Sequence, residues 1–230
     1  MEFARHTTKD VPGYTKAVHD LKWNREGNFL GMVSADKTVK IGQLDRSGAF
    51  QNVHSIPNSS QMIQLCWHSN EDSRLAICGD DKNVEIWDVR GSRAAMKIPT
   101  MGNNINVAWS PSGNNIVVGN RNDVLTVIDV RKGQQLTKKK FLYEVNELAW
   151  SANDQYLFSA TGGDGVGAVD VLSMENGELT VVDTIVGHVS NSINLKVDPL
   201  YRRMAVGSLD LSISLWDLES LTCTATCPLE

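Results

Sequence analysis

Residues 186–218 read VGHVSNSINLKVDPLYRRMAVGSLDLSISLWDL. The stretch starts with Gly187-His188 after one valine, continues as an alternating apolar run to Val197, and then has an Asp-Pro pair that is typical of a turn. A second alternating run follows, and Trp216-Asp217 stands near its end. Alternation with period two predicts half-buried β-strands joined by tight turns. This stretch decides the fold, because the rest of the chain contains weaker copies of it.

Four weaker copies precede this stretch. A bulky residue ends the first strand of each copy, at Trp23, Trp67, Trp109, Trp150 and Val197. A second anchor, at the position of Trp216, is assigned to Gly42, Trp87, Ile128, Val169 and Trp216. Both series repeat at intervals of about 41 to 47 residues, which is the period of one propeller blade. Two anchors that keep one period indicate five repeats.

Polar turns follow the first strand of every copy. They lie at residues 24–27, 68–71, 110–113, 151–154 and 198–201. No segment has the pattern of a long amphipathic helix. We therefore predict an all-β fold, a β-propeller with five blades of four antiparallel strands. The predicted organisation is an N-terminal segment, residues 1–16, and a propeller, residues 17–230, with blades at about 17–57, 58–99, 100–140, 141–186 and 187–230.

The layout of the fifth copy resembles a WD40 repeat. That resemblance implies a buried hydrogen-bonded chain formed by His188, Ser208, Asp210 and Trp216. In such a chain the carboxylate accepts from the histidine and the indole N–H is also satisfied. A trio of His, Ser and Asp could also suggest a hydrolase, but Ser208 lies in a predicted strand without a nucleophile elbow. A structural network is therefore favoured over a catalytic one.

The other four copies lack this set. Nine residues before their strand-ending anchors stand Tyr14, Asn58, Thr100 and Phe141. We therefore expect those blades to rely on packing. The lone His19 and His68 have no metal-ligand partners at useful spacing, so neither predicts a metal site.

Composition limits the classes of function. A net charge of −5 over 230 residues argues against a chain built mainly to coat nucleic acid. The basic cluster at Arg131-Lys132 and Lys138-Lys139-Lys140 falls where a hairpin loop and an edge strand are expected. The four cysteines, at positions 66, 78, 223 and 227, form no disulfide or zinc pattern and favour a reducing compartment. We expect no membrane span, signal peptide, metal or other cofactor.

The number of copies is lower than in most WD40 rings, which have seven blades. Residues 8–11 could form a closing strand, but the fifth copy carries its own candidate outer strand at residues 222–226. We therefore expect part of a seven-bladed ring without two of its blades, with a closed five-bladed ring as the alternative. An open arc would expose its first and fifth blades and is expected to associate through them.

Several strings carry a more specific resemblance than the WD40 pattern. In copy two they are residues 64–68 (QLCWH) and 82–90 (KNVEIWDVR). The more specific ones lie in eroded copies, at 104–111 (NINVAWSP), 118–124 (VGN followed by DV) and 141–150 (F, EVNE and W). In order and spacing, the chain from about residue 14 to 225 resembles the THO complex subunit 3 family, also called Tex1. The resemblance implies a non-catalytic nuclear scaffold, with other THO and TREX subunits as partners. It also implies a role in coupling transcription to mRNA processing and export, with RNA met indirectly and no small-molecule substrate.

A second interpretation rests on residues 87–90. Trp87, Asp88 and Arg90 form a WD-x-R string that resembles those by which substrate receptors dock on adaptors of cullin-type ubiquitin ligases. An arginine after a strand is more often a solvated end residue, so this stays the alternative. An enzyme is the least favoured class, because no phosphate loop, metal cluster or activated nucleophile is visible.

Overall fold

The computed structural model describes residues 10–91, 93–163, 165–175 and 177–229. Blade 1 consists of β1 (Val18–Trp23), β2 (Leu30–Ser34), β3 (Thr38–Leu44) and β4 (Phe50–Pro57). Blade 2 consists of β5 (Met62–Trp67), β6 (Arg74–Gly79), β7 (Asn83–Asp88) and β8 (Ala94–Pro99). Blade 3 consists of β9 (Asn104–Trp109), β10 (Asn115–Asn120), β11 (Val124–Asp129) and β12 (Gln134–Lys140). Blade 4 consists of β13 (Glu144–Trp150), β14 (Tyr156–Gly163), β15 (Val166–Glu175) and β16 (Glu178–His188). Blade 5 consists of β17 (Ser192–Val197), β18 (Arg203–Ser208), β19 (Ser212–Asp217) and β20 (Thr222–Pro228).

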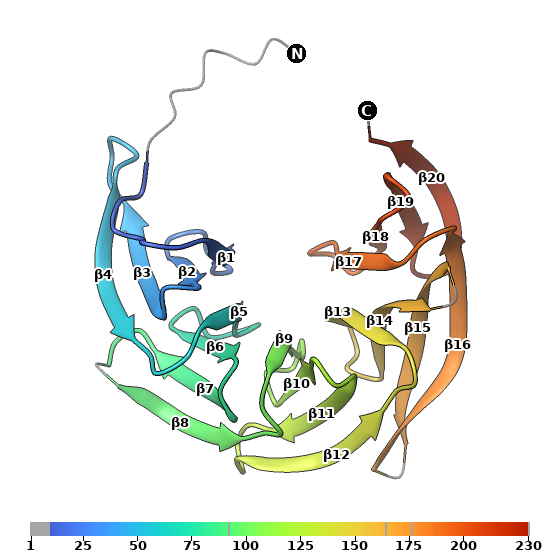
Figure 1. The fold of residues 1–230 in the computed structure, drawn as a ribbon, viewed down its shortest axis with the longest axis horizontal. Coiled ribbons are helices and arrows are strands. Elements are labelled where there is room, and N and C mark those ends of the chain that lie inside the picture. The colour runs from blue at the N-terminus through green and yellow to red at the C-terminus, as the bar shows by residue number, and fades with distance from the viewer. Residues whose placement is uncertain (1–9, 92, 164, 176, 230) are drawn as a thin grey trace.

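Each blade is one antiparallel sheet whose strands follow sequence order. The first strand of each blade lies toward the centre and the fourth lies at the rim (Figure 1). The predicted all-β propeller with five four-stranded blades is thus confirmed. β16 runs on to His188, so Gly187 and His188 end the outer strand of blade 4 and lead into blade 5.

The polar turns after the first strands have a shared backbone geometry. Their last residues have positive φ in four blades: Gly27 (69°), Gly113 (77°), Asp154 (60°) and Tyr201 (54°). A left-handed residue lets a short turn return the chain into the next strand, which is why small or polar residues are common there. Tyr201 departs from that preference.

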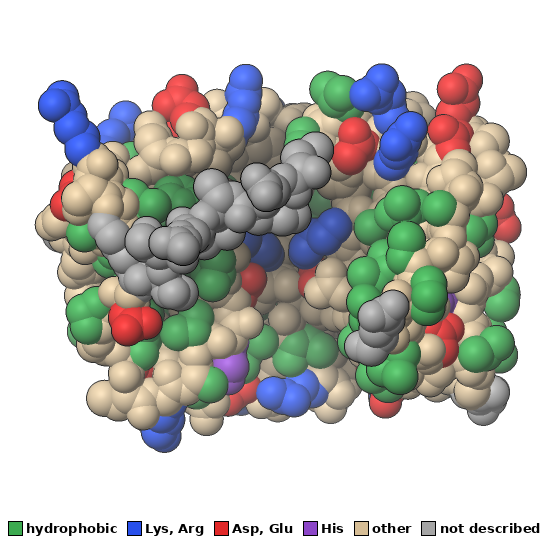
Figure 2. Space-filling model, turned by 90° about the horizontal axis from the view of Figure 1, so that it is seen from above, with side chains coloured by type: hydrophobic (Ala, Val, Ile, Leu, Met, Phe, Trp, Pro, Cys, Tyr) green, Lys and Arg blue, Asp and Glu red, His purple; other side chains and the backbone are tan. Residues whose placement is uncertain are grey.

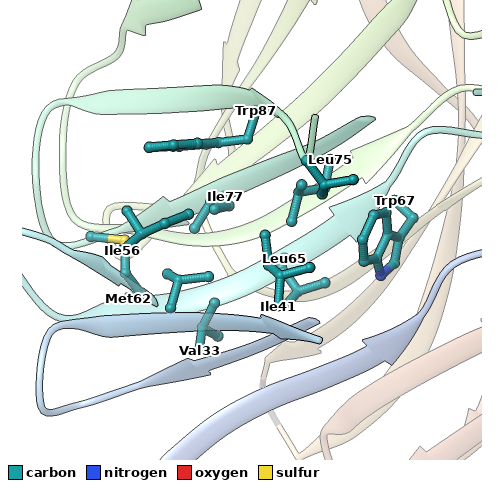
Figure 3. Close-up of a cluster of buried hydrophobic side chains, with 11 residues drawn as sticks. Val33, Ile41, Ile56, Met62, Leu65, Trp67, Leu75, Ile77 and Trp87 are labelled. Atoms are coloured by element: carbon teal, nitrogen blue, oxygen red, sulfur yellow. The ribbon is translucent and has the colours of Figure 1, made fainter. Parts of the chain in front are cut away.

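The hydrophobic core lies between the blades. Val33, Ile41 and Ile56 of blade 1 pack against Leu65 and Trp87 of blade 2 (Figure 3). Three equivalent clusters join the remaining neighbours. We call the side of a blade that meets the next blade its forward face, and the opposite side its backward face. Each blade is stabilised by its neighbours, because a sheet must bury its apolar faces against another layer.

The arc is open. β1 and β17 lie on opposite sides of an opening (Figure 1). Trp23, on the backward face of blade 1, is 44% exposed, whereas its counterpart Trp67 is 7% exposed against blade 1. The predicted strand at residues 8–11 begins outside the described residues, and residues 10 and 11 lie in no strand. The number of blades in a complete ring stays a prediction.

One predicted anchor is wrong. Strand pairing aligns Leu75 with Trp87 and Met204 with Trp216, and in blade 4 it aligns Leu157 with Leu172 rather than with Val169. Leu172 packs between blades 3 and 4, as an anchor should, whereas Val169 packs on the forward face. The cause is a longer β14–β15 hairpin, which shifts the third strand of that blade along the sequence.

Candidate functional site

A line of buried polar groups runs through blade 5. The indole N–H of Trp216 donates to Ser214 Oγ at 2.7 Å. Ser214 Oγ lies 2.7 Å from His188 Nε2, and His188 Nδ1 lies 3.0 Å from Asp210 Oδ2. Ser212 Oγ donates to Asp210 Oδ1 at 2.6 Å. The fold thus brings His188, Asp210 and Trp216 together from β16, the β18–β19 turn and β19.

One arrangement of protons gives every polar group of this line a hydrogen-bond partner. Ser214 donates to Nε2 of His188, and the Nδ1–H of His188 donates to the Asp210 carboxylate. Hydrogen bonds from Ser212 and then from His188 lower the pKa of Asp210 to about 2, so the carboxylate is ionised at neutral pH. The His188 side chain is 2% exposed, which leaves a substrate no access to it. We take this line to be structural.

Ser208 lies beside this line of groups. Its hydroxyl donates to the Ser190 carbonyl at 2.8 Å and accepts the Asp210 amide at 3.1 Å, so it fixes the turn that carries Asp210. The hydroxyl between His188 and Trp216 belongs to Ser214, which sequence reasoning did not single out. Its position two residues before Trp216 in one strand was the available signal, because alternate residues share a face.

Gly187 is required by the same packing. A Cβ at this position would lie 2.4 Å from Cζ2 of Trp216, well inside van der Waals contact. The glycine of the Gly-His pair therefore leaves room for the indole ring that the polar groups hold. This contact ties the end of blade 4 to the third strand of blade 5.

The expectation that the other blades rely on packing is wrong for blade 2. Glu85 stands two residues before Trp87, as Ser214 does before Trp216. Glu85 Oε2 accepts from Trp87 Nε1 at 2.8 Å, and Lys97 Nζ lies 2.5 Å from Glu85 Oε1. Glu85 thus takes the place of Ser214 as acceptor of the indole N–H, and Lys97 takes the place of His188 as its partner.

Blades 4 and 1 also hold polar groups at this position. Asp170, two residues before the corrected anchor of blade 4, accepts from the Tyr143 hydroxyl and from Thr184 Oγ1, the latter at 2.8 Å. Burial and the hydrogen bond to Asp170 raise the pKa of Tyr143. In blade 1, Lys40 Nζ lies 4.3 Å from the ring centroid of Tyr14. The blades therefore share one polar position and fill it with different chemistry.

The residues of the alternative docking string have local roles. Trp87 is 8% exposed and packs between blades 1 and 2. Arg90 Nη2 lies 2.6 Å from Asp88 Oδ2, and the Arg90 Nε–H donates to Asp88 Oδ1 at 2.9 Å. This side-on pair lowers the pKa of Asp88 to about 2. Arg90 is thus engaged within its own turn.

A central recess of about 680 Å³ is lined by the inner strands of all five blades. Two of its lysine side chains have acidic partners. Lys22 lies 3.1 Å from Asp20, Lys196 lies 3.7 Å from Glu147, and the Gln64 amide donates to Glu147 at 3.1 Å. Figure 2 shows Lys or Arg side chains on both walls of the opening, with Asp or Glu beside them. Arg25 and three aromatic residues, Trp109, Trp150 and Tyr201, also line the recess.

Among the residues that the structure describes, no group of three or more His, Cys, Asp or Glu side chains could hold a metal ion. Cys78 is buried, Cys66 is half-buried, and Cys223 and Cys227 are exposed on the outer strand of blade 5. No helix in the described part of the chain is long and apolar enough to cross a membrane.

Exposed apolar side chains recur at one loop position. Met101, Leu142 and Val189 each stand eight residues before the residue that ends the next inner strand, in three successive connections between blades. Their exposures are 52%, 99% and 84%. Leu209 and Leu211, in the β18–β19 turn at the same end of the blades, are 56% and 66% exposed. We call these five residues the loop face.

This structure is typical of a WD-repeat β-propeller. Its polar groups are buried within the blades, and its exposed apolar side chains lie on the loops and end faces. The comparisons agree with this class. A family model described as "Eukaryotic translation initiation factor eIF2A" matches residues 14–164, which hold blades 1 to 3 and the first two strands of blade 4. THO complex subunit 3 of Arabidopsis thaliana is 35% identical over 95% of this chain and 69% of its own length. The chain belongs to the THO complex subunit 3 family of WD-repeat proteins.

Two further relatives are more distant. Protein TEX1 of Saccharomyces cerevisiae is 22% identical over 85% of this chain and 47% of its own length. WD repeat-containing protein AAC3 of Dictyostelium discoideum is 28% identical over 97% of this chain and 51% of its own length. The chain therefore spans about half the length of these two relatives. None of these similarities supports the ubiquitin-ligase alternative.

Proposed function

We propose that this protein is a non-catalytic scaffold subunit of a THO-type assembly. In this role it acts in the nucleus, within the machinery that couples transcription to mRNA processing and export. The observation that carries the proposal is the 35% identity to THO complex subunit 3, which extends over 95% of the chain. The partners are other protein subunits, and RNA is met indirectly through them.

The loop face is the proposed contact surface for those subunits. Leu142 and Val189 point into solvent almost completely, although each is a large or branched apolar side chain. Single exposed apolar residues are common on protein surfaces, whereas a repeated series on one side of a molecule is typical of an interface. A propeller holds such loops on a rigid frame, which suits recognition by surface.

Capture from nuclear extract tests this proposal. The tagged chain is expected to retain THO subunits, identified by mass spectrometry. A Leu142→Asp/Val189→Asp variant should lower their recovery at least tenfold without changing the thermal melt, since both side chains make few contacts. Leu200→Asp is the matched control, because Leu200 is 65% exposed in the β17–β18 turn at the other end of the blade. Recovery of no THO subunit by the unchanged chain would contradict the proposal.

A further inference from the structure

The outer strand of blade 4, β16, is the longest strand of the described chain, with 11 residues. It lies at the rim, outside β15 (Figure 1). Near its start, the Leu179 carbonyl accepts from Lys139 Nζ of blade 3 at 2.9 Å, so the free run begins at residue 180. Residues 180–184, 186 and 187 are exposed. We call residues 180–187 the β16 edge.

One position of the outer strands distinguishes blade 4 from the other blades. It pairs with the residue four before the anchor of the third strand, and in blades 1 to 5 it holds Pro57, Pro99, Lys140, Val186 and Pro228. Proline and lysine at a free edge discourage another strand from pairing with it. Val186 is β-branched and 63% exposed, and such residues favour strand pairing. Blade 4 therefore lacks the protection that the other four blades have at this position.

Two backbone N–H groups of the β16 edge face outward. The Thr184 N–H donates to the side chain of its own neighbour, Asp183 Oδ1, at 2.8 Å. Val186 stands two residues further, so its N–H points to the same side of the strand. Proline at the matching position of three blades agrees with this, because proline has no N–H and is tolerated where that group would face solvent. The edge thus offers the alternating donors and acceptors that an added strand needs.

The β16 edge does not depend on the ends of the row of blades. Neighbouring blades pack face to face through the four core clusters. A further blade next to blade 1 or blade 5 would therefore cover a face of that blade and leave the rim of blade 4 free. In the described part of the chain, no strand pairs with the outer side of β16.

Charge selects the occupant of the edge. β16 carries two carboxylates, Glu178 and Asp183, and has no lysine or arginine. Two copies paired edge to edge would bring these acidic strands together, and like charges across a strand pair are destabilising. Asp183 and Val186 lie on opposite sides of the sheet, because they are three residues apart in one strand. An extended segment with a basic residue on one side and an aliphatic residue on the other fits both.

We propose that the β16 edge is a docking site at which an extended segment of a partner subunit adds a fifth strand to blade 4. The segment pairs with Thr184 and Val186 through its main chain. It displaces the Asp183 carboxylate from the Thr184 N–H and meets that carboxylate with a basic side chain. This inference rests on the proposed scaffold function, and it names a second contact surface and the chemistry of the segment that binds there.

Amide hydrogen exchange followed by mass spectrometry tests the site in the full chain. The exchange of residues 180–187 is compared between the purified protein and the assembly captured from nuclear extract. We expect these amides to exchange at least tenfold more slowly in the assembly, because an added strand gives them hydrogen-bond partners. The outer strand of blade 1, residues 50–57, is the internal control and should exchange equally in both samples.

Val186→Pro gives blade 4 the residue that three other blades have at this position. The blade should therefore keep its thermal melt, whereas the added strand loses a donor. Val186→Lys, which matches Lys140 of blade 3, is the second variant. Both should abolish the slow exchange of the remaining edge amides. Val53→Lys is the matched control, because Val53 is 47% exposed on the outer strand of blade 1, and it should have no effect.

Two further variants define the occupant. Asp183→Lys should lower the slowing of exchange at least tenfold, since it repels a basic segment, and an unchanged slowing would contradict the assigned charge. A benzophenone amino acid in place of Val182, which is 53% exposed, should form photo-cross-links to another subunit. Val186→Pro should abolish those cross-links.

Two results would overturn this inference. Equal exchange of the β16 edge in the purified protein and in an assembly that contains THO subunits would show that no partner strand is added there, and would leave the proposed function standing. Photo-cross-links to the same chain or to a second copy would assign the edge to a different occupant. Slow exchange with cross-links to a protein outside any THO assembly would keep the added strand and refute the proposed function.

Discussion

Ser214→Ala tests the buried line of polar groups in blade 5. The substitution removes the hydroxyl that joins the Trp216 indole to His188, each at 2.7 Å. Two buried groups then lose a partner, the Trp216 N–H and His188 Nε2. An unsatisfied buried polar group costs about 1–3 kcal/mol, so with two such groups the free energy of unfolding should fall by about 2–6 kcal/mol.

Urea unfolding followed by tryptophan fluorescence measures this loss. With a slope of about 2 kcal/mol per molar urea, the midpoint should fall by about 1–3 M. Ser220→Ala is the matched control, because Ser220 is exposed and its hydroxyl bonds Asp217 at the surface, so its change should stay within about 0.5 kcal/mol.

A double-mutant cycle with Trp216→Phe separates the hydrogen bond from the loss of packing. Phenylalanine keeps an aromatic ring and removes the N–H, so Ser214→Ala should cost about 1–2 kcal/mol less in that background. A cost of Ser214→Ala below about 0.5 kcal/mol, or strict additivity with Trp216→Phe, would refute the reasoning.

Gly187→Ala should destabilise the chain by about 1–3 kcal/mol through overpacking on Trp216, and a thermal melt unchanged from wild type would exclude the close contact. The pKa of Asp210 is lowered from 3.8 to about 2, so its stabilising contribution is present above pH 4 and is lost as the pH falls toward 2. Asp210→Asn should therefore flatten the stability profile over that range, measured by urea unfolding. Burial lowers the pKa of His68 below 6.5, so folding favours the neutral ring and stability should decline as the pH drops from 7 to 5. His68→Gln should reduce that slope, and an unchanged slope would contradict the assignment. Arg90→Ala should change the free energy of unfolding by less than about 0.5 kcal/mol, since its pair with Asp88 is exposed.

Sequence reasoning predicted the architecture because its signal repeats. Trp67, Trp109 and Trp150 end inner strands as expected, and the turns that follow them lie where the polar segments predicted. Alternation identifies the strands, and a fixed period groups them into blades. Both signals, the alternation and the fixed period, arise because each strand buries one face against the next blade.

The errors arose where local chemistry departed from the repeat. In blade 4 the longer β14–β15 hairpin moved the anchor from Val169 to Leu172, and alternation alone cannot distinguish these two apolar residues. Glu85 and Asp170 fill the polar position with carboxylates, which a search for the usual histidine does not find. Their further partners, Lys97 for Glu85 and Thr184 for Asp170, come from neighbouring strands, so those contacts depend on pairing register rather than on spacing.

The opening between blade 1 and blade 5 affects how the five described blades unfold. Blades 2, 3 and 4 each have two neighbours, whereas the end blades have one. A row of units that contact mainly their neighbours behaves as a linear array, in which melting starts at the ends and moves inward. Amide hydrogens of β10 and β11, in the middle blade, should therefore exchange last. In such an open row, an end blade can unfold while the other blades stay folded, which is not possible in a closed ring.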